Sequence, residues 1–337
     1  MKTVLLSYVV GIKYWVFFKM GGVLMSIVVV ADSSCDLPQK YWDSSCVEVF
    51  PFGLLIDGVP SEDSRNPDMM TKFFKEDLVG KQHTAESMPL SKEKIIDYFN
   101  EKIVTKYDFA LILTAAKGRS ETYQNFMMAA NDIVLSYRPY REAAGLKTNF
   151  NMRVINSGTL FAGLGVLVSH MMDLVEQGLS TKELRISAEV LRNNIYTYCV
   201  PHDLYYLSTR AKAKGDKSVS VFAALIANLF NIIPVILGHM DETSPVAKFR
   251  GYKNTVNRVF KLTCLRIDAG LESPRVVVSY AGDIKDLKRF SGYRRLVKHA
   301  KKHGVKVETS VMSIVGGLNL GPKTLTVGFA SQPHTFE

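Results

Sequence analysis

Short runs of apolar, often β-branched residues alternate with helical patterns along this chain of 337 residues, and this alternation constrains its fold most strongly. In the first half the runs lie at residues 27–31, 47–56, 109–113 and 154–155. Continuous apolar runs of this kind are typical of strands that are buried on both faces, as in a parallel sheet covered by helices. The pattern therefore predicts an α/β fold.

Capping residues mark where helices begin between these runs. Asn66 precedes Pro67, which suits the first position of a helix, and Ser91 precedes a segment with a single apolar stripe. Another helix is expected to open at Ser120 or Glu121. These signals predict three helices in the first half of the chain, before residue 140.

An apolar helix is expected to begin after Thr159, and Gly163 and Gly165 within it should allow close packing. The segment Gln177-Gly178-Leu179-Ser180 follows, and Ser180 or Thr181 can cap the next helix. We therefore predict a domain boundary here, with domains at 26–178 and 179–337. Residues 1–25 form a separate apolar extension.

The second half repeats the alternation of strands and helices, without an internal repeat or a flexible linker. We expect strands at 203–207, 235–237, 276–280, 305–311 and 324–329, and helices at 219–231, 252–263 and 284–303. The sequence thus predicts two α/β domains that meet at a tight junction.

The composition is that of an ordinary globular protein, with 47% hydrophobic and 22% charged residues, which excludes a disordered or low-complexity chain. Its four cysteines are too few for a disulfide scaffold, and none forms a CxxC pair. We expect four reduced thiols in a cytoplasmic protein, without a metal site or a cofactor.

The positive charge is concentrated in one stretch. Residues 251–310 contain fourteen Lys or Arg and five acidic residues, so +9 of the net charge of +10 lies there. Three interpretations of this basic stretch remain open: a solvated helix face, a docking face for an acidic protein, or a site for nucleic acid or anionic lipid. Only Phe290 and Tyr293 lie near the densest part, 293–306, so a nucleic-acid partner is not expected.

The first 25 residues are apolar, but Lys13 and Lys19 divide them into runs too short to span a bilayer. No small-residue cleavage site follows the first run. We interpret this segment as an upstream extension from a start codon placed too early, with a membrane anchor or signal as the alternative. A chain that begins at Met25 should then fold, because the first strand is expected to begin at Ile27.

Common catalytic signatures such as GxSxG, HExxH and a GxGxxG after the first strand are absent from the sequence. Residues 316–324, GGLNLGPKT, approach the phosphate-binding pattern GxxxxGK[ST], but Pro322 interrupts it and a strand-like segment follows. A glycine turn between strands is the favoured interpretation. A phosphotransferase that uses residues 316–323 is the enzymatic alternative.

Four polar clusters follow or flank predicted strands, at residues 32–38, 83–89, 113–124 and 156–158. Ligands of α/β sheets bind beyond the carboxyl ends of the strands, where hydroxyls and free N–H groups converge. Each Ser or Thr taken singly can instead cap a helix. Four such loops together predict one shared binding site.

The order of these motifs resembles that of the DegV family of bacterial fatty-acid-binding proteins, over about residues 26–331. The chain has ADSSCDLP, HTAESMP and SETYQ where the family has DS-x-x-DLP, T-S-Q-P-S and S-G-T-Y-Q. The segments INSGTLFAGLGVLV, DLYYL, FAALIANLFNIIPVI and GGLNLGPKTLTVGF are similar to the family's later motifs.

The resemblance implies a first domain with a mainly parallel sheet, a second with a mixed or antiparallel sheet, and a lipid tunnel between them. It implies a cytoplasmic carrier, not an enzyme, that binds a long-chain fatty acid. Such a carrier presents the fatty-acid carboxylate to a separate fatty-acid kinase. The kinase would dock on a basic surface, for which we take Arg294, Arg295, Lys298 and Lys301.

The resemblance also implies a set of fatty-acid-binding residues, several of which are altered here. Thr84 and Ser120 keep family hydroxyls, and Ser33 stands at the serine of DS-x-x-DLP. Ala116, Lys217 and Asn319 fall where the family has a serine, an arginine and a histidine. The alternative is therefore a divergent lipid-binding paralogue that holds a different amphiphile without kinase coupling.

Overall fold

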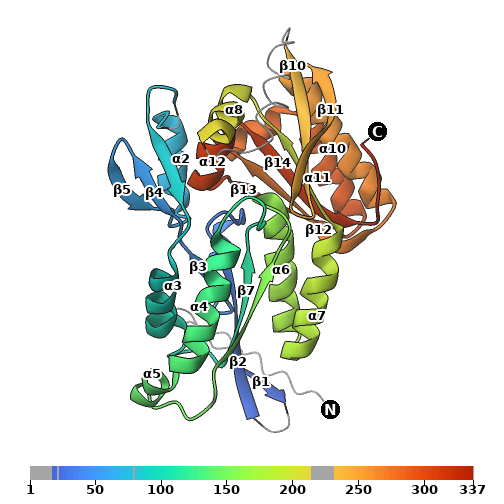
Figure 1. Ribbon diagram of the computed structural model, residues 1–337. Coiled ribbons are helices and arrows are strands. Elements are labelled where there is room, and N and C mark those ends of the chain that lie inside the picture. Colours follow the sequence, from blue (N-terminus) through green and yellow to red (C-terminus); the bar gives the residue numbers. More distant parts are fainter. Residues whose placement is uncertain (1–16, 21–22, 79, 214–230, 337) are drawn as a thin grey trace.

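A computed structural model describes residues 17–20, 23–78, 80–213 and 231–336 of the chain (Figure 1). The first half forms a five-stranded sheet in which β2, β3, β7 and β8 are parallel and β1 pairs antiparallel with β2. These strands are β1 (Phe17–Met20), β2 (Val23–Asp32), β3 (Val47–Phe50), β7 (Phe109–Thr114) and β8 (Asn151–Asn156).

The second half forms a six-stranded sheet in the order β11-β10-β9-β14-β12-β13. Only β12 and β13 are parallel neighbours in it, so the sheet is mixed. The strands are β9 (Ile195–Val200), β10 (Ile232–His239), β11 (Glu242–Arg250), β12 (Leu271–Tyr280), β13 (Lys306–Val311) and β14 (Leu325–Ser331). The predicted fold class, with a mainly parallel and a mixed sheet, is confirmed.

A third, small antiparallel sheet was not predicted. It consists of β4 (Gly53–Ile56), β5 (Val59–Glu62) and β6 (Ala85–Met88), and lies beside α2 (Pro67–Lys75) (Figure 1). The prediction of one strand over 47–56 was wrong, because β3 and β4 belong to different sheets. Pro51 lies between them and has no N–H with which to continue a strand ladder.

The other α-helices up to residue 191 are α1 (Gln39–Trp42), α3 (Lys92–Tyr98), α4 (Thr122–Ser136), α5 (Arg138–Ala143), α6 (Ala162–Glu176) and α7 (Thr181–Leu191). Three predicted caps are confirmed. The Asn66 side chain accepts from the N–H groups of Asp68 and Met69, and Ser91 accepts from the N–H of Lys94. Ser180 forms a capping box with Glu183 at the start of α7.

The second half contains α8 (Leu204–Ala213), α10 (Tyr252–Asp268), α11 (Ser291–Lys302) and α12 (Ile314–Leu320). The prediction of a strand at 203–207 was wrong, since Leu204 already begins α8 and the Asp203 carboxylate accepts from the N–H of Tyr205. The predicted helix 284–303 is a 3-10 turn at Ile284–Arg289 followed by α11. Most of the helix predicted at 219–231 lies outside the described residues.

The glycine-rich segment also differs from its prediction. Gly316 and Gly317 lie inside α12, which Ser313 caps, and Gly321 ends the helix with a φ of 87°. The chain then enters β14, so a helix here leads into a strand. A phosphate loop instead leads from a strand into the N-terminus of a helix, so the structure does not support the phosphotransferase alternative.

Helix α6 is the structural centre of the molecule, because it packs on both large sheets. It contacts β9, β12 and β14 on one side and β2 and β7 on the other (Figure 1). A β-carbon on Gly163 would lie 1.9 Å from Oγ1 of Thr197, and one on Gly165 would lie 2.6 Å from the Asp36 carbonyl oxygen. The expectation that these glycines allow close packing is confirmed.

Strand β2 begins at Val23 and pairs with β1, so part of the predicted extension adjoins the sheet. The expectation that the first strand begins at Ile27 was wrong, because the strand that contains Ile27 is β2, which begins at Val23, and β1 precedes it. Among the described residues, no helix is both long enough and apolar enough to cross a bilayer.

Candidate binding cavity between the two halves

A cavity of about 930 Å³ lies between the two halves of the chain. The first half contributes the loop 115–121, which follows β7, and residues 158–161, which follow β8. The second half contributes strands β9 and β10, residues 241–243 where the hairpin turn enters β11 (Glu242–Arg250), and α12. The cavity therefore lies at the carboxyl ends of the parallel strands, where the sequence predicted a shared site.

Much of the cavity wall is apolar. It includes the side chains of Phe52, Leu160, Phe161, Ile236, Val315 and Leu320. Cys199 adds a thiol whose pKa is raised to about 12 by burial, so the group stays protonated and behaves as a small apolar side chain. A wall of this composition suits a hydrocarbon chain.

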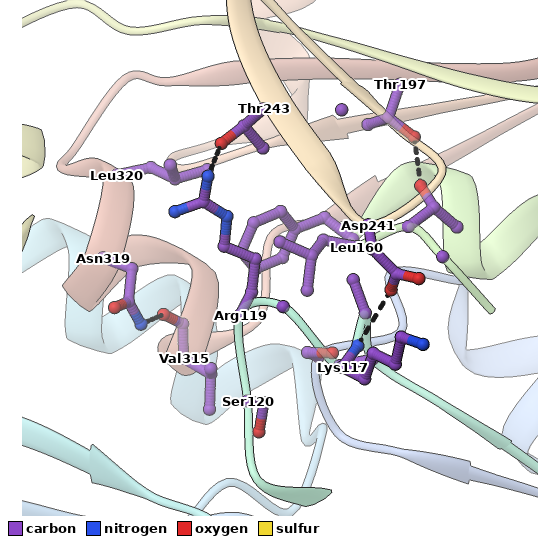
Figure 2. A pocket seen from close by; sticks show the side chains of 18 of the residues that line it. Lys117, Arg119, Ser120, Leu160, Thr197, Asp241, Thr243, Val315, Asn319 and Leu320 are labelled. Atoms are coloured by element: carbon purple, nitrogen blue, oxygen red, sulfur yellow. Dashed lines mark hydrogen bonds between the residues drawn. The ribbon is translucent and has the colours of Figure 1, made fainter. Parts of the chain in front are cut away.

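Polar side chains gather on the loop after β7 and on α12 (Figure 2). The loop supplies Lys117, Arg119 and Ser120, and α12 supplies Asn319. The Arg119 guanidinium donates a hydrogen bond to the Thr243 hydroxyl of β11, so this arginine links the two halves. The cavity thus combines an apolar wall with a polar, partly basic region.

The turn between β10 and β11 connects the second half to the loops of the first. Oδ1 of Asp241 accepts from the N–H of Lys117 at 3.0 Å, and both carboxylate oxygens accept from the Asn156 amide. The N–H of Asp241 donates to the Gly158 carbonyl at 2.9 Å. Gly118 lies so near that a β-carbon would stand 2.8 Å from the Asp241 carbonyl oxygen.

A buried ionic network also joins the halves. The Arg65 guanidinium lies 3.1 Å from the Asp36 carboxylate, and both side chains are almost fully excluded from solvent. Arg65 also donates to the Ser310 hydroxyl and the Val311 carbonyl at the end of β13. The N–H of Ser313, which caps α12, donates to Asp36. These bonds fix the position of α12, and so of one cavity wall.

Asp32 joins the loop that follows β2 to the loop that follows β7. Its carboxylate accepts from the hydroxyl and the N–H of Ser34, and from the N–H of Ala115 at 2.6 Å. Burial removes water from the carboxylate and raises its pKa to about 6, although these hydrogen bonds oppose the shift. Asp32 therefore holds the backbone of two cavity-lining residues, Ser34 and Ala115.

Three of the six predicted fatty-acid-binding residues line the cavity: Ala116, Ser120 and Asn319. The Ser120 hydroxyl lies 2.7 Å from that of Thr122 and accepts from the Thr122 N–H at the start of α4. The Asn319 amide donates to the Val315 carbonyl at 2.7 Å and to the Ser87 hydroxyl at 3.3 Å.

Of the other three, Thr84 and Ser33 do not line the cavity. The Thr84 hydroxyl and N–H both donate to the Asp57 carboxylate at the edge of the small sheet. The Ser33 hydroxyl is buried and accepts from the N–H of Phe52, while its neighbour Ser34 lines the cavity. Lys217 lies outside the described residues. A role for these three in binding stays a prediction.

Sequence reasoning missed Arg119, Asp241 and Thr243. Arg119 lies within the polar cluster 113–124, so its position at a strand end was available as a signal. Met240 and Asp241 both have positive φ values, which two-residue hairpin turns require, and Asp is common in such turns. That turn signal predicts a hairpin but says nothing of the loops on which it packs.

The two α/β halves thus share the central helix α6 and enclose a cavity. The sequence profile of the DegV family, described as a family of uncharacterised proteins, matches residues 26–332. The chain therefore belongs to the DegV family. It is 37% identical over 312 residues to a DegV domain-containing protein of Xanthomonas axonopodis pv. citri, covering 93% of this chain and 99% of that one.

Solved structures of low sequence identity share the fold. A stearic acid-binding protein from Eubacterium ventriosum has a TM-score of 0.73 and 18% identity, covering 90% of this chain and 98% of that one. DegV of Bacillus subtilis, described as a fatty acid binding protein, has a TM-score of 0.69 and 17% identity. That match covers 91% of this chain and the whole of the other.

Proposed function

We propose that this protein binds one long-chain fatty acid in the cavity between its halves and acts as a carrier, not as a catalyst. The observation that carries the proposal is the cavity itself, about 930 Å³ in volume, with an apolar wall and a polar region that includes Arg119. The fatty-acid ligands named for relatives of the same fold support it. The four cysteines, all free and buried, fit the cytoplasmic location that we propose.

Burial of the acyl chain provides most of the binding free energy. Each methylene contributes about 0.8 kcal/mol, so fourteen methylenes contribute about 11 kcal/mol before the costs of ordering. A charge-assisted hydrogen bond to the carboxylate adds about 1.5–3 kcal/mol. The replacement of one serine by Ala116 and of a histidine by Asn319 is therefore compatible with lipid binding.

We place the carboxylate beside the loop after β7, where Arg119 and Ser120 face the cavity and Asn319 lies opposite on α12 (Figure 2). Arg119 supplies a permanent positive charge in this region, and a guanidinium matches the geometry of a carboxylate. Thr84, Ser33 and Lys217 remain proposed contacts from the family resemblance.

Identification of the bound lipid tests the main proposal. The purified protein should release a fatty acid on extraction, detected by mass spectrometry. Leu160→Trp should reduce the bound lipid severalfold because the larger ring fills the cavity. Val190→Trp, which adds the same ring at an exposed site on α7, should leave it unchanged. Extraction of no lipid, together with no binding of added fatty acid, would refute the proposal.

The position of the head group is tested by a comparison of acid and alcohol. Arg119→Met should weaken binding of the fatty acid by about 1.5–3 kcal/mol and that of the matching fatty alcohol by much less. Thr84→Val tests in the same way whether Thr84 contacts the carboxylate, as the family resemblance implies. Arg289→Met, at an exposed site, is the control. Equal losses for acid and alcohol would place the carboxylate elsewhere.

A different amphiphile is the second candidate. The specific observation is that Ala116 and Asn319 line the cavity where the resemblance gives a serine and a histidine. Extraction of a neutral or larger lipid, with the fatty acid bound weakly, would support this candidate instead.

We further propose that the carrier presents the carboxylate to a separate fatty-acid kinase that docks on α11. Arg294, Arg295, Lys298 and Lys301 are all exposed on this helix, which buries Leu296 and Ala300. Changing all four to Glu should weaken the kinase complex most at low salt, where charge steering is strongest, and leave lipid binding intact. An unchanged affinity at low salt would exclude this docking face.

A further inference from the structure

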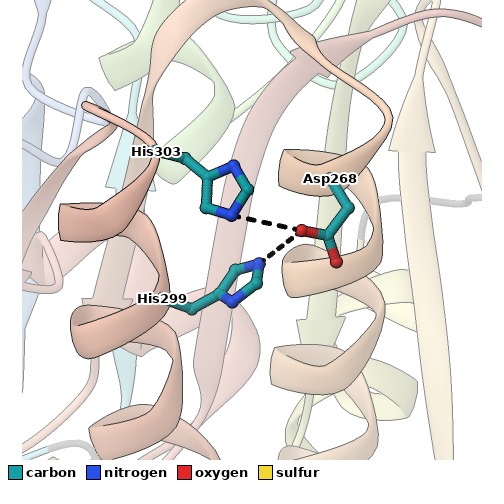
Figure 3. Close-up of side chains that lie close together, drawn as sticks. All are labelled: Asp268, His299 and His303. Carbon is teal, nitrogen blue, oxygen red and sulfur yellow. Dashed lines mark hydrogen bonds and ion pairs between the residues drawn. The ribbon is translucent and has the colours of Figure 1, made fainter.

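Two histidines and a carboxylate lie together on the second half of the molecule, outside the cavity (Figure 3). Asp268 is the last residue of α10. His299 lies in the last turn of α11, and His303 is the C-cap residue that follows it. Their spacing of four residues places both imidazoles on one face of the helix. Both rings point toward the Asp268 carboxylate (Figure 3).

The three side chains lie close enough together for one atom of each to reach a common ion. Oδ1 of Asp268 lies 2.8 Å from Nε2 of His299 and 3.4 Å from Nε2 of His303. One ligand atom from each residue lies within 4.8 Å of the others. Two ligand atoms that share a tetrahedral zinc ion at about 2.0–2.1 Å stand about 3.3–3.4 Å apart. Small side-chain rotations would therefore admit an ion.

We propose that Asp268, His299 and His303 bind a divalent transition-metal ion of the zinc, cobalt or nickel type. Two imidazole nitrogens and one carboxylate oxygen favour these borderline metals, whereas magnesium and calcium prefer ligand sets made only of oxygen. Three protein ligands leave further coordination positions for water or for a group of another molecule. The sequence led us to expect no metal site, because the histidine spacing alone does not reveal Asp268.

The location supports the assignment. Side-chain exposures of 48% for Asp268, 25% for His299 and 41% for His303 give an ion access from solvent. The ligands lie on two helices that pack against each other, so their relative positions are largely fixed before an ion binds. Lys298, Lys301 and Lys302 on the same helix repel a cation, which limits the affinity.

Metal titration of the full chain, freed of metal by a chelator, tests the proposal. Co²⁺ and Zn²⁺ are added in turn, with Co²⁺ followed by its visible spectrum and Zn²⁺ by calorimetry. We expect one ion per chain and no competition from millimolar Mg²⁺.

The variants His299→Gln, His303→Gln and Asp268→Asn should each weaken binding at least about tenfold. The matched control is His83→Gln, because His83 pairs with the Asp57 carboxylate at 2.5 Å as a single His–Asp pair. It should bind like the wild type, and circular dichroism confirms that each variant is folded.

The proposal is overturned if the wild type binds no ion, or if the three site variants bind as tightly as the wild type. Either result would mean that Asp268 serves only as a hydrogen-bond acceptor for the two imidazoles. Equal loss in His83→Gln would likewise overturn it, since binding would then not depend on this cluster.

Discussion

At the scale of single residues, buried carboxylates on the first-half loops decide how the cavity is built. Asp32, Asp36 and Asp63 are all fully buried, and burial raises the pKa of each. Each accepts from backbone N–H groups of a cavity wall or of a segment that supports one. Removing one partner of such a network costs several kcal/mol, because the remaining charge stays buried without compensation.

Asp32 is expected to give the stability a measurable pH dependence. Its folded-state pKa of about 6 exceeds the ordinary value of 3.8, so the folded protein binds this proton more tightly than the unfolded chain does. The resulting stabilisation is complete below about pH 4 and is lost as the pH rises through about 6, a change of up to about 3 kcal/mol.

Urea unfolding of the wild type and of Asp32→Asn between about pH 4 and pH 7 measures this effect. The unfolding free energy of the wild type should fall with rising pH relative to that of the variant. Asp36 and Asp63 titrate in both proteins and cancel in the difference. Parallel curves for the two proteins would show that the Asp32 pKa is not raised.

At the scale of elements, the β10–β11 hairpin and helix α6 hold the two halves together. The hairpin belongs to the sheet of the second half, but its turn is bonded to the loops after β7 and β8. Helix α6 has an almost uniformly buried surface because a large sheet covers it on either side.

The hairpin contact is expected to control the opening of the cavity. Asp241→Ala removes the acceptor for the Lys117 N–H and the Asn156 amide, and should cost about 1.5–3 kcal/mol locally. Hydrogen exchange of residues 116–119 should become faster, and the bound lipid should dissociate sooner. Glu142→Ala, at an exposed carboxylate on α5 away from the cavity, is the control. Unchanged exchange in 116–119 would contradict this role.

The packing of α6 should not tolerate a methyl group at Gly163. A β-carbon there would lie 1.9 Å from the Thr197 hydroxyl and 2.2 Å from that of Thr159, which hydrogen-bond each other. Gly163→Ala is therefore expected to destabilise the protein by about 1–3 kcal/mol in chemical unfolding, despite the better helix propensity of alanine. Gly53→Ala, whose nearest contact would be 3.6 Å away, should cost less. Equal stability of the two variants would refute the argument.

At the scale of the whole molecule, the hydrophobic core does not follow the predicted division at 178/179. One core cluster contains Ile27 and Leu111 of the first sheet, Leu164 of α6, and Val277 and Ala330 of the second sheet. The two halves thus share buried surface through α6. The domain limits themselves stay a prediction, but the shared core favours unfolding of the halves together.

A chain that begins at Met25 is expected to fold. It lacks β1, but it retains Ser26 and Ile27, at which the buried part of β2 begins. Its melting temperature should lie within a few degrees of that of the full chain, and its lipid content should be unchanged. If the shortened protein is insoluble while the full chain is soluble and stable, the pairing of β1 with β2 is required for folding.

Much of the fold could be predicted from the sequence, because the burial of a strand or helix is reflected in the pattern of apolar residues along that segment. The apolar runs at 27–31 and 109–113 indicated strands covered on both faces, and Asn66, Ser91 and Ser180 marked helix starts through short-range capping bonds. The parallel first sheet followed from such local patterns, and the family resemblance followed from the order of the motifs. The mixed second sheet was implied by that resemblance.

Tertiary structure alone decided the features that depend on distant segments. A short amphipathic run such as DLYYL fits a strand or a helix, and only its packing against α12 selects α8. The run 47–56 divides between two sheets because β4 finds its partners in β5 and β6.

The same holds for the binding site. The sequence identified the loop after β7, but the contact of Lys117 with Asp241 and that of Arg119 with Thr243 each join residues 124 positions apart. Likewise, the pairing of His299 with Asp268 spans 31 positions. Local patterns record which residues are buried, whereas the choice of partner across such separations depends on how the two halves pack, and no local pattern contains that information.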